Sequence, residues 1–190
     1  MKNLFLLLLA AWTISSANAQ TWTLDKTHTD IRFTVTHMTI SEVDGEFKEF
    51  DGKVVSKGAD FNGATVEFSA KTASINTDSE RRDGHLKGAD FFDAEKHPEL
   101  KFKGALQKKG KAYLLVGDFT MKGVTKPVKF NAVYTGKVAT QRGAKAGFKI
   151  TGTVNRFDYG VKWDNKMDTG GLVVGENVQI TCNVELNEAK

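Results

Sequence analysis

The sequence predicts an all-β protein, specifically an eight-stranded antiparallel up-and-down barrel. Alternation of apolar and polar residues recurs in about eight short segments, most of them separated by hairpin-length turns. Only one segment has a helical pattern, and 18 glycines against 2 prolines suit a turn-rich β protein. The same pattern is compatible with a two-sheet sandwich, which is the alternative architecture.

The clearest strands have one apolar and one polar face. Residues 31–37 alternate strictly, so Phe33, Val35 and His37 share one face with aliphatic neighbours. A core histidine with satisfied hydrogen bonds is therefore the more frequent outcome for His37, ahead of ligand contact or catalysis. Cys182 falls on the apolar face of the last strand, where a thiol packs rather than reacts. Alternation turns further phenylalanines inward: Phe68, Phe102, Phe119, Phe130 and Phe148.

These inward phenylalanines leave two interpretations open. A barrel of about eight strands can enclose one small ligand, and an aromatic lining would then hold an apolar molecule. Alternatively, the same side chains fill a solid core. The pattern alone favours neither interpretation.

The segment Ser79–Asp93 differs from everything around it. Thr77 to Glu80 has the T-x-x-E form of a capping box, which predicts a helix from Glu80 to Lys87 that ends at Gly88. The following pair, Phe91 and Phe92, needs an apolar environment. A polar helix followed by apolar side chains is expected to lie as a lid over the mouth of the barrel.

Two groups of charged residues are candidates for chemistry. Arg82, Asp83 and His85 are compatible with an acid–base cluster, with an ion pair internal to the helix, or with a site for an anionic head group. Arg156 and Asp158 form a second Arg/Asp pair at a strand end. Two such pairs either line one rim or attach the helix to the barrel.

The N-terminus has the pattern of a secretory signal peptide. Lys2 is followed by a leucine-rich run that is shorter than the roughly 20 residues of a spanning helix, and Ala17-Asn18-Ala19 is a cleavage motif. We expect residues 1–19 to be a signal peptide cleaved after Ala19, and residues 20–190 to be one exported domain. The predicted location is the periplasm.

Several function classes have little support in the sequence. The formal net charge of +4 is mild, and no basic helix or basic–aromatic run indicates nucleic-acid binding. There is no serine elbow, phosphate-binding glycine loop or thiolate pair. None of the four histidines, His28, His37, His85 and His97, has tight metal-ligand spacing. We therefore predict no catalytic residue, no metal and no cofactor.

A series of motifs resembles the YceI-like family. Its opening is matched by Trp22–Met38, and its central motif by Ser74–Asp93 with Arg82-Asp83-x-His85-Leu86 and Asp90-Phe91-Phe92-Asp93. Later motifs are matched by Gly117–Val128 and Asn155–Gly160. The resemblance covers essentially the whole mature chain. One departure is the polar stretch Gly136–Gly147, which we predict to be an extended mobile loop.

The resemblance implies an extended lipocalin-like barrel with a helix near its opening. It also implies binding of a long amphiphilic lipid, such as a polyisoprenoid, an isoprenoid quinone, or a fatty acid or amide, and it does not imply an enzyme. Expected partners are this lipid, a transiently contacted membrane and a second copy of the chain. The predicted ligand-binding residues are Phe33, Val35, His37, Phe47, Phe68, Arg82, Asp83, His85, Phe91, Phe92, Phe102, Phe119, Phe130, Phe148, Arg156 and Asp158.

Two rival functions remain open at this point. One is an enzyme that modifies lipids or quinones, with His85 and Asp83 as its acid–base pair. The other is a stress-related binding protein whose core is solid.

Overall fold

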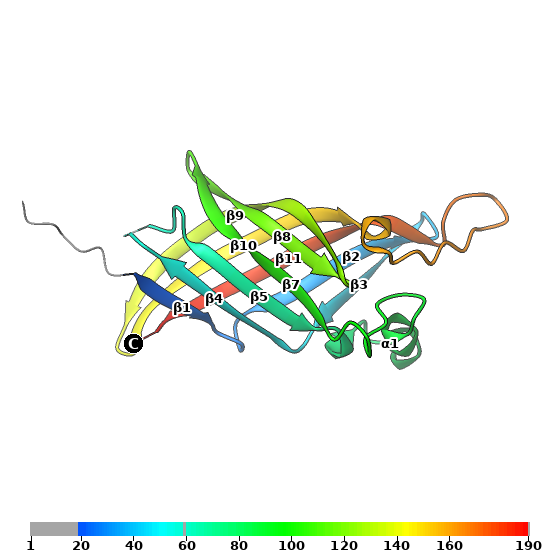
Figure 1. The fold of residues 1–190 in the computed structure, drawn as a ribbon, viewed down its shortest axis with the longest axis horizontal. Coiled ribbons are helices and arrows are strands. Elements are labelled where there is room, and N and C mark those ends of the chain that lie inside the picture. The colour runs from blue at the N-terminus through cyan, green and yellow to red at the C-terminus, as the bar shows by residue number, and fades with distance from the viewer. Residues whose placement is uncertain (1–18, 59, 190) are drawn as a thin grey trace, which may run out of the picture.

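Eleven antiparallel strands form a single sheet that closes on itself in the computed structural model, which describes residues 19–58 and 60–189 (Figure 1). Eight strands form the ring, in the order β1-β4-β5-β7-β8-β9-β10-β11, and β11 pairs with β1 to complete it. This closure confirms the predicted barrel and excludes the sandwich. The strands are β1 (Gln20–Leu24), β2 (Asp30–His37), β3 (Ser41–Phe47), β4 (Phe50–Ser56), β5 (Thr65–Lys71), β6 (Ile75–Asn76), β7 (Glu99–Lys109), β8 (Ala112–Met121), β9 (Val124–Thr140), β10 (Gly143–Asn155) and β11 (Val174–Glu188).

The remaining strands extend the barrel at one end. β11 pairs with β1 near its C-terminus, where Leu24 faces Leu186, and with β2 near its start, where His37 faces Val174. β3 adds to β2, and the short β6 adds to β3. β11 therefore pairs with β1 inside the ring and with β2 outside it, and β3 and β6 continue the sheet beyond β2.

The one α-helix in the described residues, α1 (Glu80–Lys87), lies at this extended end (Figure 1). Its bounds confirm the predicted helix, and Gly88 ends it with a backbone bond from its N–H to the carbonyl of His85. Two short 3₁₀ helices accompany it, η1 (Thr72–Ser74) and η2 (Arg156–Tyr159). Among the described residues, no helix has both the length and the apolar composition needed to cross a bilayer.

The predicted mobile loop Gly136–Gly147 is wrong, because these residues form the β9–β10 hairpin. The two strands pair as far as Thr140 and Gly143, with an irregular register next to Phe148. Most side chains between Thr135 and Arg142 are exposed. This part of the hairpin is wet on both faces, so it loses the apolar alternation from which strands are predicted.

A pair of glycines allows β7 and β8 to approach closely. Gly104 faces Gly117 across the two strands, and a Cβ on either residue would come within 2.3 Å of a backbone carbonyl oxygen of the other strand. The ring of Phe102 also reaches both positions, at 2.7 and 2.8 Å from these notional Cβ atoms. Glycine thus leaves room for an aromatic ring to lie along the inner wall.

The end opposite α1 is filled by aromatic side chains. Phe61, from the connection between β4 and β5, is buried and packs against Trp22, Tyr134 and Phe148 with ring-centroid distances of 5.0–5.8 Å. Tyr113 packs against the same Tyr134 and Phe148. This cluster forms a plug across that end of the barrel.

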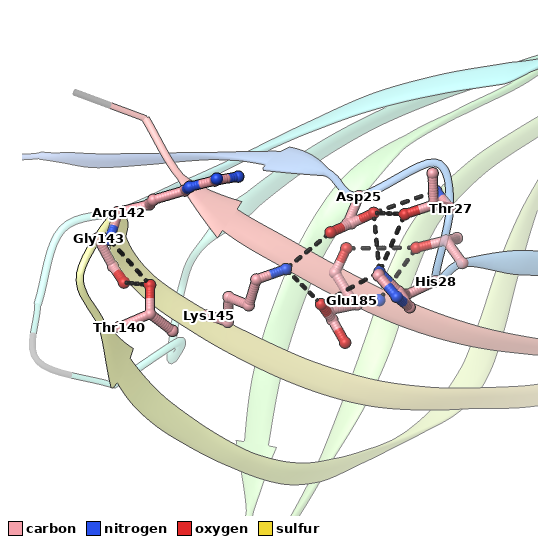
Figure 2. Close-up of polar contacts among 9 residues, drawn as sticks. Asp25, Thr27, His28, Thr140, Arg142, Gly143, Lys145 and Glu185 are labelled. Atoms are coloured by element: carbon pink, nitrogen blue, oxygen red, sulfur yellow. Dashed lines mark hydrogen bonds and ion pairs between the residues drawn. The ribbon is translucent and has the colours of Figure 1, made fainter.

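An ion-pair network ties the β1–β2 turn to the two strands beside it (Figure 2). The Lys145 ammonium on β10 donates to Asp25 at 2.7 Å and to Glu185 of β11 at 2.6 Å. Thr27 also donates to Asp25, from both its hydroxyl and its backbone N–H. His28 lies 3.2 Å from Asp25, so a histidine and two carboxylates converge, but Lys145 already occupies the cationic position between the carboxylates.

This network predicts an acid-dependent contribution to stability. The hydrogen bond from Lys145, followed by those from Thr27, lowers the pKa of Asp25 far below its ordinary value. The contribution is therefore complete above the unfolded-state pKa of about 4, and it declines as the pH falls from there toward the lowered folded-state pKa. In Lys145→Met, the loss of unfolding free energy relative to wild type should be larger at pH 7 than at pH 3. Urea titrations at both pH values measure it, and an equal loss at both would contradict this role.

Candidate ligand-binding cavity

The barrel interior contains an apolar cavity of about 150 Å³, here called the central cavity. Cavities of this size lined by aliphatic and aromatic groups stay dry and accept apolar molecules. Three charged residues border it, but their side chains point outward; those of Arg32 and Glu67, for example, are 61% and 62% exposed. The inner wall comes mainly from Leu24, Ile31, Phe47, Val54, Val66, Phe68, Leu100, Phe102, Leu106, Leu115, Phe119, Phe130, Phe148, Ile150, Ile180, Val184 and Leu186.

Cys182 also faces this cavity and is buried. Burial raises the pKa of its thiol to about 12, because the thiolate would lose its hydration. The thiol is therefore neutral near pH 7 and behaves as a small apolar side chain. This agrees with the expectation that Cys182 packs rather than reacts.

The central cavity continues toward the α1 end. A smaller chamber of about 90 Å³, the antechamber, shares the walls Phe47, Phe119 and Ile180 with the central cavity. A wider groove of about 500 Å³, the mouth groove, shares Phe33 and Phe91 with the antechamber. Because neighbouring spaces share walls, the three lie in series from the middle of the barrel to the surface beside α1, and this series is here called the passage.

The predicted aromatic residues come together along this passage. Each of the nine predicted phenylalanines borders at least one of the three spaces, as do Val35 and His37. Phe33 marks the transition from mouth groove to antechamber, and its ring crosses Gly45 of the facing strand, where a Cβ would come within 2.3 Å of it. Strand alternation identified six of these phenylalanines, and the pair Phe91 and Phe92 was identified from the segment after the helix.

Arg82 and Asp83 contact the same residue, Thr77. The buried Asp83 carboxylate accepts hydrogen bonds from the Thr77 backbone N–H at 2.9 Å and from its hydroxyl at 2.6 Å. Arg82 donates to the Thr77 hydroxyl at 2.7 Å and to its carbonyl at 2.6 Å. Of the interpretations left open for this cluster, the geometry favours attachment of the helix to β6.

The predicted capping box does not form. The N-cap residue of α1 is Ser79, whose side chain makes no capping hydrogen bond, and the Thr77 hydroxyl is used by Asp83 and Arg82. The T-x-x-E prediction is wrong here because the Thr77 hydroxyl is bound instead by Asp83, in the first turn of the helix, and by Arg82.

His85 has different partners from its neighbours on α1. Its Nε2 lies 3.1 Å from an Asp90 carboxylate oxygen, and its ring packs edge-on against Phe91 and Trp163 at 5.0 and 5.8 Å. Phe91 and Trp163 are themselves 5.4 Å apart. Trp163 was not among the predicted site residues. A tryptophan within a polar, glycine-rich stretch is nevertheless a sign that its side chain packs against other residues.

Arg156 and Asp158 do not act as a pair. Arg156 is buried and donates to three backbone carbonyls, those of Gly175, Val161 and Val174, at 2.8–2.9 Å. Burial lowers the pKa of its guanidinium. Asp158 is exposed and lies 3.4 Å from Lys126. Arg156 therefore fixes the segment that leads into β11 while bordering the antechamber, and Asp158 lies outside the passage walls, as does Asp83.

Polar residues also line the mouth groove. Among them, Arg81 belongs to α1, Ser79 is the N-cap of α1, and His37 ends β2. Within the described part of the chain, Arg81 has no ion-pair partner, and its side chain is exposed. The mouth groove thus adds polar donors to the apolar walls of the two inner spaces.

The closed ring, the apolar interior and the helix beside the opening define a lipocalin-like barrel. Residues 22–186 match the model of the YceI-like domain, so the chain belongs to the YceI-like family. Curated relatives include UPF0312 proteins of Staphylococcus aureus strains N315 and MSSA476, each 32% identical over 87% of this chain and 96% of the relative.

Solved structures share the architecture. A mutant of the YCEI protein from Campylobacter jejuni is 30% identical, with a TM-score of 0.71 over 88% of this chain and 98% of that chain. BcnA of Burkholderia cenocepacia has a TM-score of 0.72 at 23% identity, covering 85% and 98%. A polyisoprenoid-binding domain from Saccharophagus degradans has a TM-score of 0.65 at 11% identity, covering 88% and 98%. The last two similarities concern the fold alone.

The Thr77 contacts predict a specific loss of stability. Asp83→Ala removes the acceptor for two buried donors, and hydrogen bonds to a charged group are typically worth about 1.5–3 kcal/mol. We expect the free energy of unfolding to fall by about 2 kcal/mol in urea titrations. The matched control is Glu80→Ala, an exposed carboxylate on the same helix, which should cost less than about 1 kcal/mol. Equal losses in the two variants would contradict the anchoring role.

Proposed function

We propose that the protein is an exported binding protein that encloses the apolar tail of a long amphiphilic lipid and carries or sequesters it. The observation that carries this proposal is the series of adjoining apolar spaces from the barrel centre to the mouth groove, whose lining also includes polar residues. A ligand that matches it has a long apolar tail and one polar end. Polyisoprenoids, isoprenoid quinones and fatty acids or amides have this form.

The energetics support retention of such a tail. Burial of each methylene contributes about 0.8 kcal/mol, so a tail of several isoprene units gains enough to offset the loss of freedom on binding. The fold shared with the Saccharophagus degradans domain, which is described as polyisoprenoid-binding, agrees with this ligand class. Export is supported by the signal-peptide pattern of residues 1–19, of which all but Ala19 lie outside the described residues.

Binding is better supported than catalysis. Cys182 is a neutral thiol in the central cavity, and His85 and Asp83 have separate partners, Asp90 and Thr77. An acid–base pair would need these two side chains within reach of one another and of a reacting group. The function we propose therefore needs no cofactor other than the bound lipid.

The test is native mass spectrometry of the freshly purified mature protein, followed by solvent extraction. We expect an added mass that extracts as a lipid. If the predicted cleavage occurs, the mass of the protein itself should equal that of a chain that begins at Gln20. The same spectrum gives the oligomeric state. A bare protein, also after incubation with isoprenoid quinones and fatty acids, would overturn the proposal.

A matched pair of variants locates the bound tail. Ile180 borders both the central cavity and the antechamber, whereas its neighbour Gln179 is exposed on the outer face of β11. Ile180→Lys should eliminate lipid retention, because an ammonium in an apolar wall is strongly disfavoured. Gln179→Lys introduces the same charge and should retain lipid as wild type does.

Since a buried lysine also risks unfolding the barrel, a second variant keeps the test informative. Val66→Phe enlarges an apolar side chain that already borders the central cavity. It should reduce the mass of retained lipid while circular dichroism stays that of wild type. Retention of the same lipid by a folded Val66→Phe and a folded Ile180→Lys would place the ligand outside the barrel.

A further inference from the structure

The most exposed large apolar side chain in the described residues lies at the mouth of the passage. Ile40 is 85% exposed and Met38 is 42% exposed, and both belong to the β2–β3 turn. The other large apolar side chains exposed in the described chain, Val133 and Val138, lie on β9. Single exposed apolar residues need no explanation. Two exposed apolar residues that are two positions apart and lie beside an apolar passage form a distinct feature.

The backbone holds this turn in an unfavourable conformation. Met38 and Thr39 have φ values of 50° and 62°, in the left-handed region that β-branched residues rarely adopt. Several contacts maintain it. The Met38 N–H donates to the Val173 carbonyl at 2.8 Å, and the Thr39 hydroxyl donates to the Met38 carbonyl at 2.6 Å. The His37 carbonyl accepts from the Ile40 N–H at 3.2 Å and from the Ser41 hydroxyl at 3.3 Å. Strain of this kind persists where the surroundings enforce it, and it often marks a functional position.

The turn is attached to the segment that forms the other side of the mouth. Val173 and Trp163 of the connection between η2 and β11 border the mouth groove together with His37 of β2. Figure 1 shows the β2–β3 turn, this connection and α1 at the same end of the molecule. The apolar turn therefore has a fixed position relative to the opening through which a tail must pass.

The charges in the two segments next to the turn do not favour an electrostatic partner. In the connection, Lys162 and Lys166 are balanced by Asp164 and Asp168, and the exposed Glu42 lies next to the turn on β3. Attraction to anionic lipids requires a cluster of lysines and arginines, which is missing from these segments. Contact made by the turn itself therefore depends on burial of its apolar side chains.

We propose that the β2–β3 turn is a bilayer-docking element, in which Ile40 and Met38 insert into the apolar boundary of a membrane and hold the mouth against it. The proposal rests on the lipid-binding function above, since a tail that moves between bilayer and barrel without crossing water needs the mouth at the membrane surface. Binding is expected to be weak, reversible and insensitive to salt, because it lacks a charge contribution.

The test uses the full mature protein and vesicles of phosphatidylcholine, alone or with a fraction of phosphatidylglycerol, in flotation assays at low and high salt. Wild type should float with both vesicle types at both salt concentrations. Ile40→Asp should reduce partitioning on the order of tenfold, since it exchanges a buried aliphatic group for a charge. Val133→Asp is the matched control, because it places the same charge at an apolar residue that is 52% exposed elsewhere on the barrel.

Native mass spectrometry separates this proposal from the lipid-binding function. Ile40→Asp should still carry lipid, while its rate of lipid transfer between vesicles falls together with its flotation. Flotation of Ile40→Asp at the wild-type level would overturn the docking element, as would flotation that needs phosphatidylglycerol and disappears in high salt. If the turn instead seats a second copy, wild type will not float and its spectrum will show a dimer that Ile40→Asp lacks. Intact flotation by a protein that never carries lipid would overturn the binding function alone.

Discussion

The pairing of β11 with both β1 and β2 is the constraint on which the rest of the molecule depends. Through β1 it closes the ring, so that the backbone donors and acceptors of eight strands are satisfied within the sheet. A closed ring has no free edge that must be covered, which allows the inward side chains to be almost entirely apolar. The dry passage is a direct consequence of this closure.

The same strand creates the opening. β11 pairs with β2 over residues 174–183 and with β1 over residues 186–188. On the β2 side, the barrel is extended by β2, β3 and β6. The extension would leave an apolar inner face in water if nothing covered it. α1 and the connection that contains Trp163 lie beside it, held by the polar contacts of Thr77 and Arg156 with neighbouring segments. The charged residues Arg82, Asp83 and Arg156 thus hold these segments mainly through hydrogen bonds with backbone and hydroxyl groups.

The sequence was informative wherever a strand has one face toward the barrel interior and the other toward water. Strand alternation identified the phenylalanines of the central cavity other than Phe47, and the helix was correctly bounded by a polar start and by Gly88. Prediction failed where both faces are wet, as in the β9–β10 hairpin, because exposure removes the alternation. It also left the partners of Arg82, Asp83 and Arg156 open. Their acceptors and donors are chiefly backbone groups, which carry no residue-specific pattern, and Trp163 reaches the mouth from a loop that has no periodicity.

The aromatic plug around Phe61 fills the end of the barrel opposite α1, which leaves the mouth groove as the route into the passage. Any molecule held inside must leave by the route through which it came, with the part that entered last emerging first. Its polar end therefore stays at the rim, where it is the first part available to an acceptor, and its innermost part is exposed only at the end of the transfer. A cavity with one route in and out releases a bound tail gradually. The depth to which the tail is inserted, rather than a separate closing element, then sets how long it is retained.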